Sequence, residues 1–198
     1  MARHSRRAIL IGGGLALAGF TLPSNLAFAQ GSELLPTPEC RDAHDVTPRQ
    51  TEGPYYTPNA PERANLREPG MKGTALALSG LVLTRSCKPV AGAIVDLWHA
   101  DDAGEYDNKG FRLRGFVKTD AQGRYSFETI RPGLYPGRTR HFHAKVSAPG
   151  ARLLTTQLYF PGEPHNARDG IYRKELLMSV ANAGEGLAAR FDFVADLR

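Results

Sequence analysis

Short apolar or alternating runs recur along the chain from Thr74 onward, and clusters of Gly, Pro, Asp and Asn separate them. Short runs of this kind, bounded by turn residues, are typical of β-strands. With 41% apolar and 9% aromatic residues, the 198-residue chain has enough side chains to build a core. The pattern therefore predicts an all-β sandwich. The expected strands are TALALSGLVLT (74–84), AGAIVDLW (91–98), RGFVKT (114–119), RYSFETI (124–130), HFHAKVSA (141–148), LLTTQLYF (153–160) and ARFDFVAD (189–196).

Two segments of the mature chain depart from this pattern. Residues 172–180, YRKELLMSV, could form a short helix. Residues 30–72 are rich in Pro, Glu, Arg and Asn and show neither a helical nor an alternating period. We therefore expect residues 30–72 to form an extended N-terminal arm, laid over a β-sandwich domain that spans residues 73–198.

The first 29 residues have the features of an export signal. Arg6 and Arg7 form a twin-arginine pair, a moderately apolar stretch follows, and Ala27-Phe28-Ala29 is an A-x-A cleavage signal. Three consecutive glycines weaken the stretch as a membrane-spanning helix, and no later run approaches about 18 uninterrupted apolar residues. We expect residues 1–29 to be a twin-arginine-type signal peptide. The mature protein would then be periplasmic or extracellular, with no membrane contact.

The charge balance of the chain changes when that segment is removed. The full chain has a formal net charge of +5, but residues 1–29 hold three of its 25 basic residues and none of its 20 acidic ones. The remaining charge of +2 takes away the main support for nucleic-acid binding.

Cys40 and Cys87 are the two cysteines of the chain. In an oxidising compartment they favour a disulfide that ties the arm to the domain, and the alternative is two small buried thiols. The sequence has no C-x-x-C, so a cysteine-based metal site is not expected.

The stretch from Gly80 to Tyr135 resembles the prealbumin-like sandwich modules appended to peptidases and surface adhesins. The resemblance rests on CKPVAGAIVDLW followed by VKTDAQGRYSFETIRPGLY. In such modules the T-D-x-x-G-x-Y-x-F hairpin is purely structural. A secreted, non-catalytic β-sandwich binding module would thus explain everything except the polar residues at the turns.

Four of those polar residues suggest a metal site: Tyr106, Tyr135, His141 and His143. Alternate side chains of a strand share a face, so the two histidines point the same way. Two phenolates stay ionised near neutral pH only beside a strongly Lewis-acidic cation, and ferric iron fits best. Zinc would be expected with Cys, carboxylate or a third His, and copper with Cys, Met or more imidazoles.

The order and spacing of several motifs resemble the intradiol ring-cleavage dioxygenases, the catechol and protocatechuate 3,4-dioxygenase superfamily, and most of all its short, exported members. The similarity runs from about Thr51 to about Val180. The motifs that carry it are TEGPYY (51–56), Trp98-His99, GEY (104–106), TDAQGRY (119–125), GLYPGRTRHFH (133–143) and LTTQLYF (154–160).

The resemblance implies a role for each matching position. Tyr106 and His141 correspond to equatorial iron ligands, and Tyr135 and His143 to axial ones. Arg138 falls on the active-site arginine of the family, and Gln157 on its active-site glutamine. Arg140 stands just before His141, where many members have Pro or Ala, and strand alternation predicts that it lies at the surface.

Several other residues have two readings. His99 is expected to hold the end of its strand, with a supporting role at the site as the alternative. Tyr55 and Tyr56 would either line the substrate mouth or pack the arm down. His44 and His165 lie in polar loops, and we expect both to be solvated.

The resemblance implies a non-haem Fe(III) enzyme that uses O₂ to cleave catechols between the two hydroxyl-bearing carbons, giving muconate-type dicarboxylates. Tyr135 would leave the metal as the substrate binds and take up one of its protons. The alternatives are the binding module and a periplasmic copper or zinc carrier that uses the two histidines. The sequence fixes neither the ring substituents of the substrate nor the oligomeric state.

Overall fold

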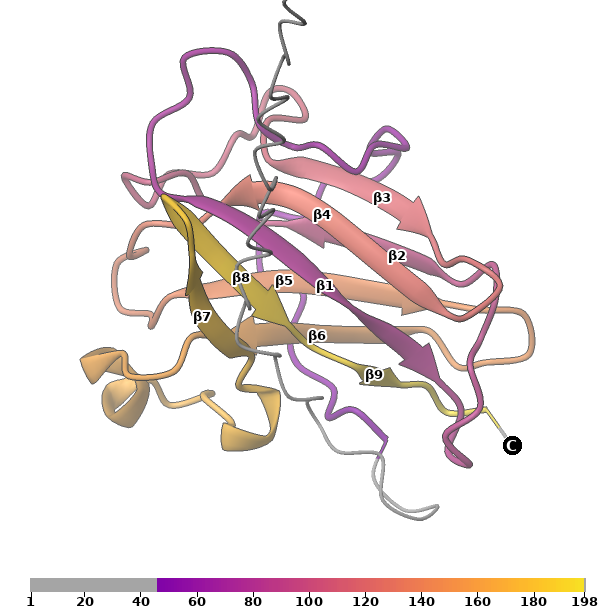
Figure 1. Cartoon of the computed structure of the whole chain (residues 1–198). Coiled ribbons are helices and arrows are strands. Elements are labelled where there is room, and N and C mark those ends of the chain that lie inside the picture. Colours follow the sequence, from indigo (N-terminus) through magenta and orange to yellow (C-terminus); the bar gives the residue numbers. More distant parts are fainter. Residues whose placement is uncertain (1–45, 198) are drawn as a thin grey trace, which may run out of the picture. The chain divides into compact units, whose positions relative to one another are not determined.

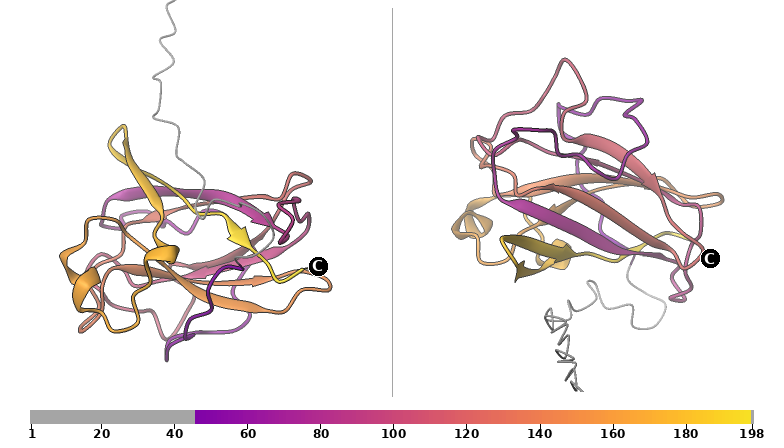
Figure 2. Two further views of the ribbon diagram at one scale, coloured as in Figure 1. Left: turned by 90° about the horizontal axis from the view of Figure 1, so that it is seen from below. Right: turned by 45° about the horizontal axis from the view of Figure 1, so that its top comes forward.

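The computed structural model describes residues 46–197; the predicted signal peptide, Cys40 and His44 lie outside the described residues. Two β-sheets stack face to face (Figure 1 and Figure 2). The elements are β1 (Ala75–Leu83), β2 (Ile94–Trp98), β3 (Arg114–Lys118), β4 (Arg124–Ile130), β5 (His141–Ser147), β6 (Leu154–Tyr159), the 3-10 helices η1 (Pro164–Arg168) and η2 (Lys174–Leu176), β7 (Ser179–Ala183), β8 (Gly186–Arg190) and β9 (Phe193–Val194). The predicted all-β sandwich is confirmed.

One sheet has the strand order β4-β1-β8-β7, with β9 paired to β1, and the other has the order β3-β2-β5-β6. In the second sheet, β5 is antiparallel to both neighbours. The register sets Trp98 of β2 and Gln157 of β6 on either side of His143. Directly opposed residues in a sheet share a face, so these three side chains form one row across the sheet.

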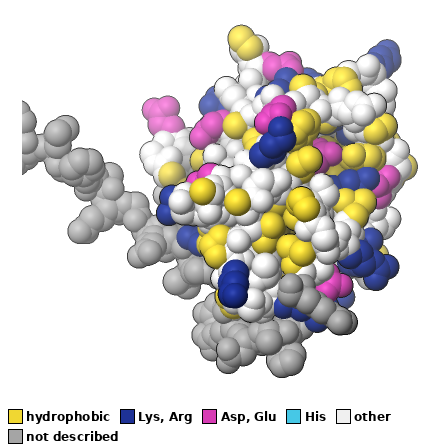
Figure 3. Space-filling view, turned by 90° about the vertical axis from the view of Figure 1, so that its right-hand side faces the viewer, with side chains coloured by type: hydrophobic (Ala, Val, Ile, Leu, Met, Phe, Trp, Pro, Cys, Tyr) yellow, Lys and Arg dark blue, Asp and Glu magenta, His cyan; other side chains and the backbone are white. Residues whose placement is uncertain are grey.

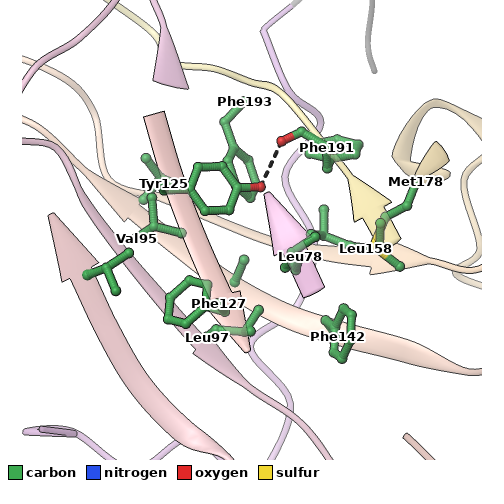
Figure 4. Close-up of a cluster of buried hydrophobic side chains, with 14 of the residues drawn as sticks. Leu78, Val95, Leu97, Tyr125, Phe127, Phe142, Leu158, Met178, Phe191 and Phe193 are labelled. Carbon is green, nitrogen blue, oxygen red and sulfur yellow. Dashed lines mark hydrogen bonds between the residues drawn. The ribbon is translucent and has the colours of Figure 1, made fainter. Parts of the chain in front are cut away.

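The core fills the space between the two sheets (Figure 4). Alternating burial along β4 sends Tyr125 and Phe127 inward, and Phe142 of β5 joins the same core cluster from the other sheet with no exposed surface. Tyr125 is buried, and its hydroxyl donates to the carbonyl oxygen of Phe191 at 2.7 Å. Burial of these rings from both sheets removes a large apolar area from water, which is the main stabilising contribution to such a sandwich.

The described part of the arm runs beside the sheets without forming a regular strand. The backbone N–H of Gln50 donates to the carbonyl oxygen of Thr155 in β6, and isolated bridges join Glu62 to Phe116 and Asn65 to Glu128. The arm therefore pairs with the edges of both sheets, as an extended segment can. Residues 46–72 are thus extended, as predicted, whereas the bounds of the arm at 30 and 72 stay a prediction.

Residues 172–180, which could form a short helix by their sequence, are helical only in part. They hold the single 3-10 turn η2 and the start of β7. The hairpin of β7 and β8 was not expected, because SVANA and GLAAR are rich in Ala and Gly rather than in β-branched residues. Within residues 46–197, no helix has the length and apolar character needed to cross a membrane.

The predicted bridge from Cys40 to Cys87 stays a prediction, because Cys40 is outside the described residues. Cys87 lies in the connection between β1 and β2, at a positive φ of 59°. On the face shown in Figure 3, cationic and anionic side chains are interspersed rather than gathered by sign.

Candidate active site

The two histidines of the H-x-H run occupy one face of β5, and Phe142 between them is buried in the core. Their Nε2 atoms are 3.2 Å apart. Nδ1 of His141 lies 2.6 Å from the carbonyl oxygen of Thr139, so Nδ1 carries the proton and donates it, and Nε2 keeps its lone pair. Burial lowers the pKa of His141 to about 4 and the pKa of His143 well below its ordinary value. Both imidazoles are therefore neutral near pH 7, the form in which they bind metals.

Two loops bring the tyrosines to the histidines. Tyr106 lies between β2 and β3, and its hydroxyl oxygen is 3.4 Å from Nε2 of His141. Tyr135 lies between β4 and β5, and its ring centroid is 5.9 Å from that of Tyr106. The ring centroids of Tyr106 and His143 are 6.0 Å apart. The four candidate ligand residues thus form one cluster, although their role as ligands stays a prediction.

These two loops meet at a glycine. Gly104 has a φ of +88°, and a Cβ at this position would overlap the carbonyl oxygen of Leu134. Only glycine both adopts this positive φ without strain and leaves room for the Leu134 carbonyl. This explains the glycine in Gly-Glu-Tyr, the sequence that ends at Tyr106. The close approach fixes the backbone of Gly104, two residues before Tyr106, against the backbone of Leu134, the residue before Tyr135.

A buried guanidinium secures the other side of the Tyr106 loop. Arg114 is 1% exposed, and it donates from Nε at 3.0 Å and from a terminal nitrogen at 2.6 Å to the carbonyl oxygen of Asp107. Its second terminal nitrogen donates to the carbonyl oxygen of Tyr55 at 2.6 Å. Arg114 therefore joins the Tyr106 loop to the arm.

The arm contributes a third tyrosine to the cluster. The Tyr55 hydroxyl lies 2.9 Å from the Tyr135 hydroxyl. The Tyr55 ring stacks on the ring of Tyr106, with centroids 4.6 Å apart and planes 19° apart. Tyr55 therefore contacts two of the candidate ligands, and its place at a substrate mouth stays a prediction.

Tyr56 has different partners. Its hydroxyl donates to Oδ2 of Asp96 at 3.2 Å, Lys145 places its ammonium 3.3 Å from the ring centroid, and Trp98 lies 4.8 Å away. Trp98 in turn stacks on His143, with centroids 4.9 Å apart and planes 11° apart. Tyr56 thus packs the arm onto the sheet, and Trp98 holds the plane of one candidate ligand.

Arg138 and Gln157 are brought together beside the cluster. A terminal nitrogen of Arg138 donates to Oε1 of Gln157 at 2.6 Å. The Tyr159 hydroxyl donates to the same oxygen at 3.1 Å. Nε of Arg138 donates to Oδ2 of Asp169 at 2.8 Å. Sequence reasoning missed Asp169 and Tyr159, although Tyr159 stands two residues after Gln157 and so shares its face of β6.

His99 is a buried structural residue. Its Nδ1 lies 2.7 Å from the carbonyl oxygen of Ala100, and its Nε2 lies 2.7 Å from Oγ1 of Thr129. Both ring nitrogens are satisfied, and burial lowers the pKa of His99 to about 4. The ring links the end of β2 to β4, as expected of a residue that holds its strand end.

The expectation of a surface position for Arg140 was wrong. Its side chain is 18% exposed, and Nε donates to Oε1 of Glu163 at 3.0 Å. Glu163 comes from the segment after β6, whose position strand alternation could not reveal. The positive charge before His141 is therefore paired with Glu163, a carboxylate that Arg140 shares with Arg131. His165 is exposed, as expected of a polar-loop residue.

The donor set of the cluster fits a mononuclear metal site. Nε2 of His141 lies within 3.4 Å of two other donor atoms, the His143 nitrogen and the Tyr106 oxygen. In the described part of the chain, no three His, Cys, Asp or Glu side chains form a metal-binding group, and the donors nearest to the two histidines are phenols. Nδ1 of His143 is buried without a hydrogen-bond partner there, which leaves Nε2 as the nitrogen that faces the cluster. Neutral imidazoles with phenols suit a hard, strongly Lewis-acidic cation such as ferric iron.

Comparison with known proteins agrees with this geometry. The Dioxygenase_C family model, described as Dioxygenase, matches residues 51–197. The chain belongs to the intradiol ring-cleavage dioxygenase family. The match covers the arm from TEGPYY onward, the four candidate ligands and both sheets.

Curated intradiol dioxygenases are similar over part of their length. Catechol 1,2-dioxygenase 2 of Acinetobacter lwoffii is 36% identical, with 60% of this chain and 53% of that enzyme covered. Catechol 1,2-dioxygenase 1 of the same organism is 33% identical, with 76% and 59% covered. Hydroxyquinol 1,2-dioxygenase of Rhizobium sp. is 34% identical, with 64% and 52% covered. The chain therefore spans between half and three fifths of the length of these relatives.

Solved structures of the intradiol family share the fold. One is the dioxygenase domain of a dioxygenase carbohydrate-binding protein fusion from the cellulolytic bacterium Streptomyces sp. SirexAA-E. It is 51% identical, has a TM-score of 0.76, and the match covers 78% of this chain and all of that one. Another is 3-chlorocatechol 1,2-dioxygenase from Rhodococcus opacus, which is 27% identical with a TM-score of 0.72, and 77% of this chain and 74% of that one are covered.

Proposed function

We propose that this protein is a non-haem Fe(III) intradiol dioxygenase that cleaves catechol-type diols with O₂ to muconate-type dicarboxylates. The observation that carries the proposal is the convergence of two imidazoles and two phenols, Tyr106, Tyr135, His141 and His143, on one point beside β5. A bound ferric ion would supply the Lewis acidity that keeps the phenols and the catechol ionised and makes the ring electron-rich. The relatives named above support catechols as the substrate class.

Tyrosine side chains of the site would take up the protons that the catechol releases on binding. The Tyr135 hydroxyl is hydrogen-bonded to Tyr55, so the phenol has a partner outside the donor set when it holds a proton. The Tyr106 ring is held by its stack under Tyr55, and its hydroxyl oxygen lies 3.4 Å from Nε2 of His141. These contacts suit Tyr106 to a fixed place in the site, whereas the bond to Tyr55 suits Tyr135 to exchange a proton with the substrate.

Arg138 and Gln157 would act on charge that develops on the ring and on oxygen. Both are preorganised by hydrogen bonds before any substrate arrives, because Gln157 also donates from Nε2 to the carbonyl oxygen of Thr51 at 3.0 Å. Donors already held in position need no reorganisation during the reaction, which is the main source of electrostatic catalysis.

One experiment separates this function from its rivals. The purified protein should contain about one iron per chain and should be coloured by charge transfer from tyrosinate to iron, with a shift on addition of catechol. A colourless protein that takes up no O₂ with catechol, protocatechuate or hydroxyquinol would support the secreted binding module instead. A protein that lacks the tyrosinate-to-iron absorption and binds copper or zinc would support the metal carrier.

The cellular location is part of the proposal. A twin-arginine signal in residues 1–29 would export the folded enzyme to the periplasm or beyond, where it would take part in the breakdown of aromatic compounds. Cell fractionation of the wild type and of an Arg6→Lys, Arg7→Lys variant tests it. Export of the wild type alone supports the twin-arginine route, and equal export of both contradicts it.

A further inference from the structure

The segment around η1 holds the loop that carries Tyr135 and Arg138. At the two ends of that loop, Arg131 and Arg140 both donate to Oε1 of Glu163, which lies just before η1. Between them, the Thr139 hydroxyl donates to Oδ1 of Asn166 at 2.7 Å. A long loop therefore gains a fixed shape from a segment that contributes no candidate ligand.

Asp169, the residue after η1, contacts Arg138, which the proposed function places next to the substrate. Its side chain is 2% exposed. Oδ2 accepts from Nε of Arg138 at 2.8 Å and from the backbone N–H of Thr139 at 2.9 Å, and Oδ1 accepts from the backbone N–H of Ile171 at 3.1 Å. The two backbone N–H bonds hold the carboxylate of Asp169 in place. Because a guanidinium is planar, the bond from this fixed carboxylate to Nε also sets the plane of the Arg138 guanidinium.

The far side of Arg138 meets Gln157, which stands opposite His143 in the sheet. The guanidinium is thus held between a buried carboxylate and a glutamine whose own position is set by Thr51 and Tyr159. None of the hydrogen bonds of Asp169 goes to the four candidate ligands.

We propose that Asp169 is a positioning residue, which acts through Arg138 by holding the guanidinium turned toward the reacting ring. The inference rests on the proposed function for its effect on turnover, but the contact itself can be tested without turnover. Because Asp169 binds Arg138 and not the candidate ligands, its loss should slow the reaction and leave iron in place.

The test is Asp169→Asn, which keeps the shape of the side chain and removes its charge. Partners behind an active group typically contribute about 10- to 100-fold, so kcat per bound iron should fall at least tenfold while iron content and visible absorption stay at wild-type values. The matched control is Asp192→Asn. Asp192 is also 2% exposed, pairs with Arg190 and accepts from the backbone N–H of Leu81, but it lies in the other sheet region. It should lose comparable thermal stability and keep wild-type kcat per iron.

Two further readouts separate positioning from a general structural role. In an Arg138→Ala background, Asp169→Asn should have no further effect on kcat, because the residue it positions is already gone. In the metal-free full chain, the Nε–H resonance of Arg138 should be protected from exchange in the wild type and lose that protection in Asp169→Asn.

The outcomes are distinct. An equal drop in kcat with and without Arg138, or an unchanged Arg138 resonance, would overturn the positioning role. Absence of turnover in the iron-loaded wild type would overturn the proposed function instead, whatever the resonance shows.

Discussion

Gly53 of the arm lies directly against the imidazole of His143. A Cβ on Gly53 would stand 3.2 Å from Cε1 and 3.8 Å from Nε2 of that ring, and the residue has a φ of +73°. The arm is therefore a wall of the candidate metal site. Any side chain at this position would press on Cε1 of His143, the ring carbon next to the nitrogen proposed to bind iron.

We expect Gly53→Ala to weaken iron retention. Gly70→Ala is the matched control, because Gly70 has a φ of +76° and nothing within 4 Å of its would-be Cβ. Both variants carry the left-handed backbone penalty of about 1–2 kcal/mol, but only the first displaces His143. Dissociation of iron into a chelator should be about tenfold or more faster for Gly53→Ala. Equal iron retention by the two variants would contradict the contact.

The four candidate ligands should act as a unit. Tyr106→Phe removes one anionic donor, and His141→Ala or His143→Ala opens the coordination shell, so each should lose iron or activity. His165→Ala is the control, because His165 is an exposed residue of η1, and this variant should keep both. Metal analysis with O₂-uptake assays measures the result. Full iron occupancy and turnover in any one of the three variants would show that its residue is not a ligand.

Arg138→Ala should keep iron and colour while kcat falls by about 10²- to 10³-fold, the usual effect of removing one preorganised charge-stabilising group. A permanently charged guanidinium cannot be a ligand, which is why the metal should stay. The variant should also unfold at a lower temperature, since Asp169 is left buried without its ion-pair partner. Loss of colour with little change in kcat would contradict the electrostatic role.

His99 should make stability depend on pH. Its pKa is lowered from 6.5 to about 4 by burial, so unfolding takes up a proton between these values and stability falls as pH falls through that window. The loss amounts to up to about 3 kcal/mol, at about 1.4 kcal/mol per pH unit. Urea unfolding should show that the advantage of the wild type over His99→Gln shrinks by this amount from pH 7 to pH 4. A difference that does not vary with pH would contradict the assignment.

The sequence was sufficient for the strands with a clear pattern and for naming the residues that meet in the candidate site. Alternation in RYSFETI and HFHAKVSA predicted β4 and β5 and placed His141 and His143 on one face. Residues 172–180 could form a helix because Lys, Glu and Leu are good helix formers, but only the turn η2 is helical there, so tertiary contacts outweighed the local preference. The β7–β8 hairpin was not expected because Ala and Gly are poor strand formers, and the pairing of the two strands decided the structure.

The supporting residues could not be predicted, because their roles depend on contacts between distant segments. Asp169 is 31 positions from Arg138, and nothing in its local sequence marks it as an ion-pair partner. The stack of Trp98 on His143 depends on the register of β2 against β5, which strand patterns alone do not fix. The contacts of Gly53 with His143 and of Tyr55 with Tyr135 depend on the path of the arm, which has no periodic sequence pattern.

The position of ring cleavage tests the central claim most directly. An anionic phenol–imidazole site should activate an electron-rich catecholate for attack between its two oxygen-bearing carbons, whereas a site of two histidines and one carboxylate would be expected to cleave beside the diol. The measurement is the product formed from catechol by iron-loaded protein under ¹⁸O₂. We expect cis,cis-muconic acid that carries both atoms of one O₂, apart from exchange with water. Yellow hydroxymuconic semialdehyde, or no product with catechol, protocatechuate or hydroxyquinol, would contradict the account.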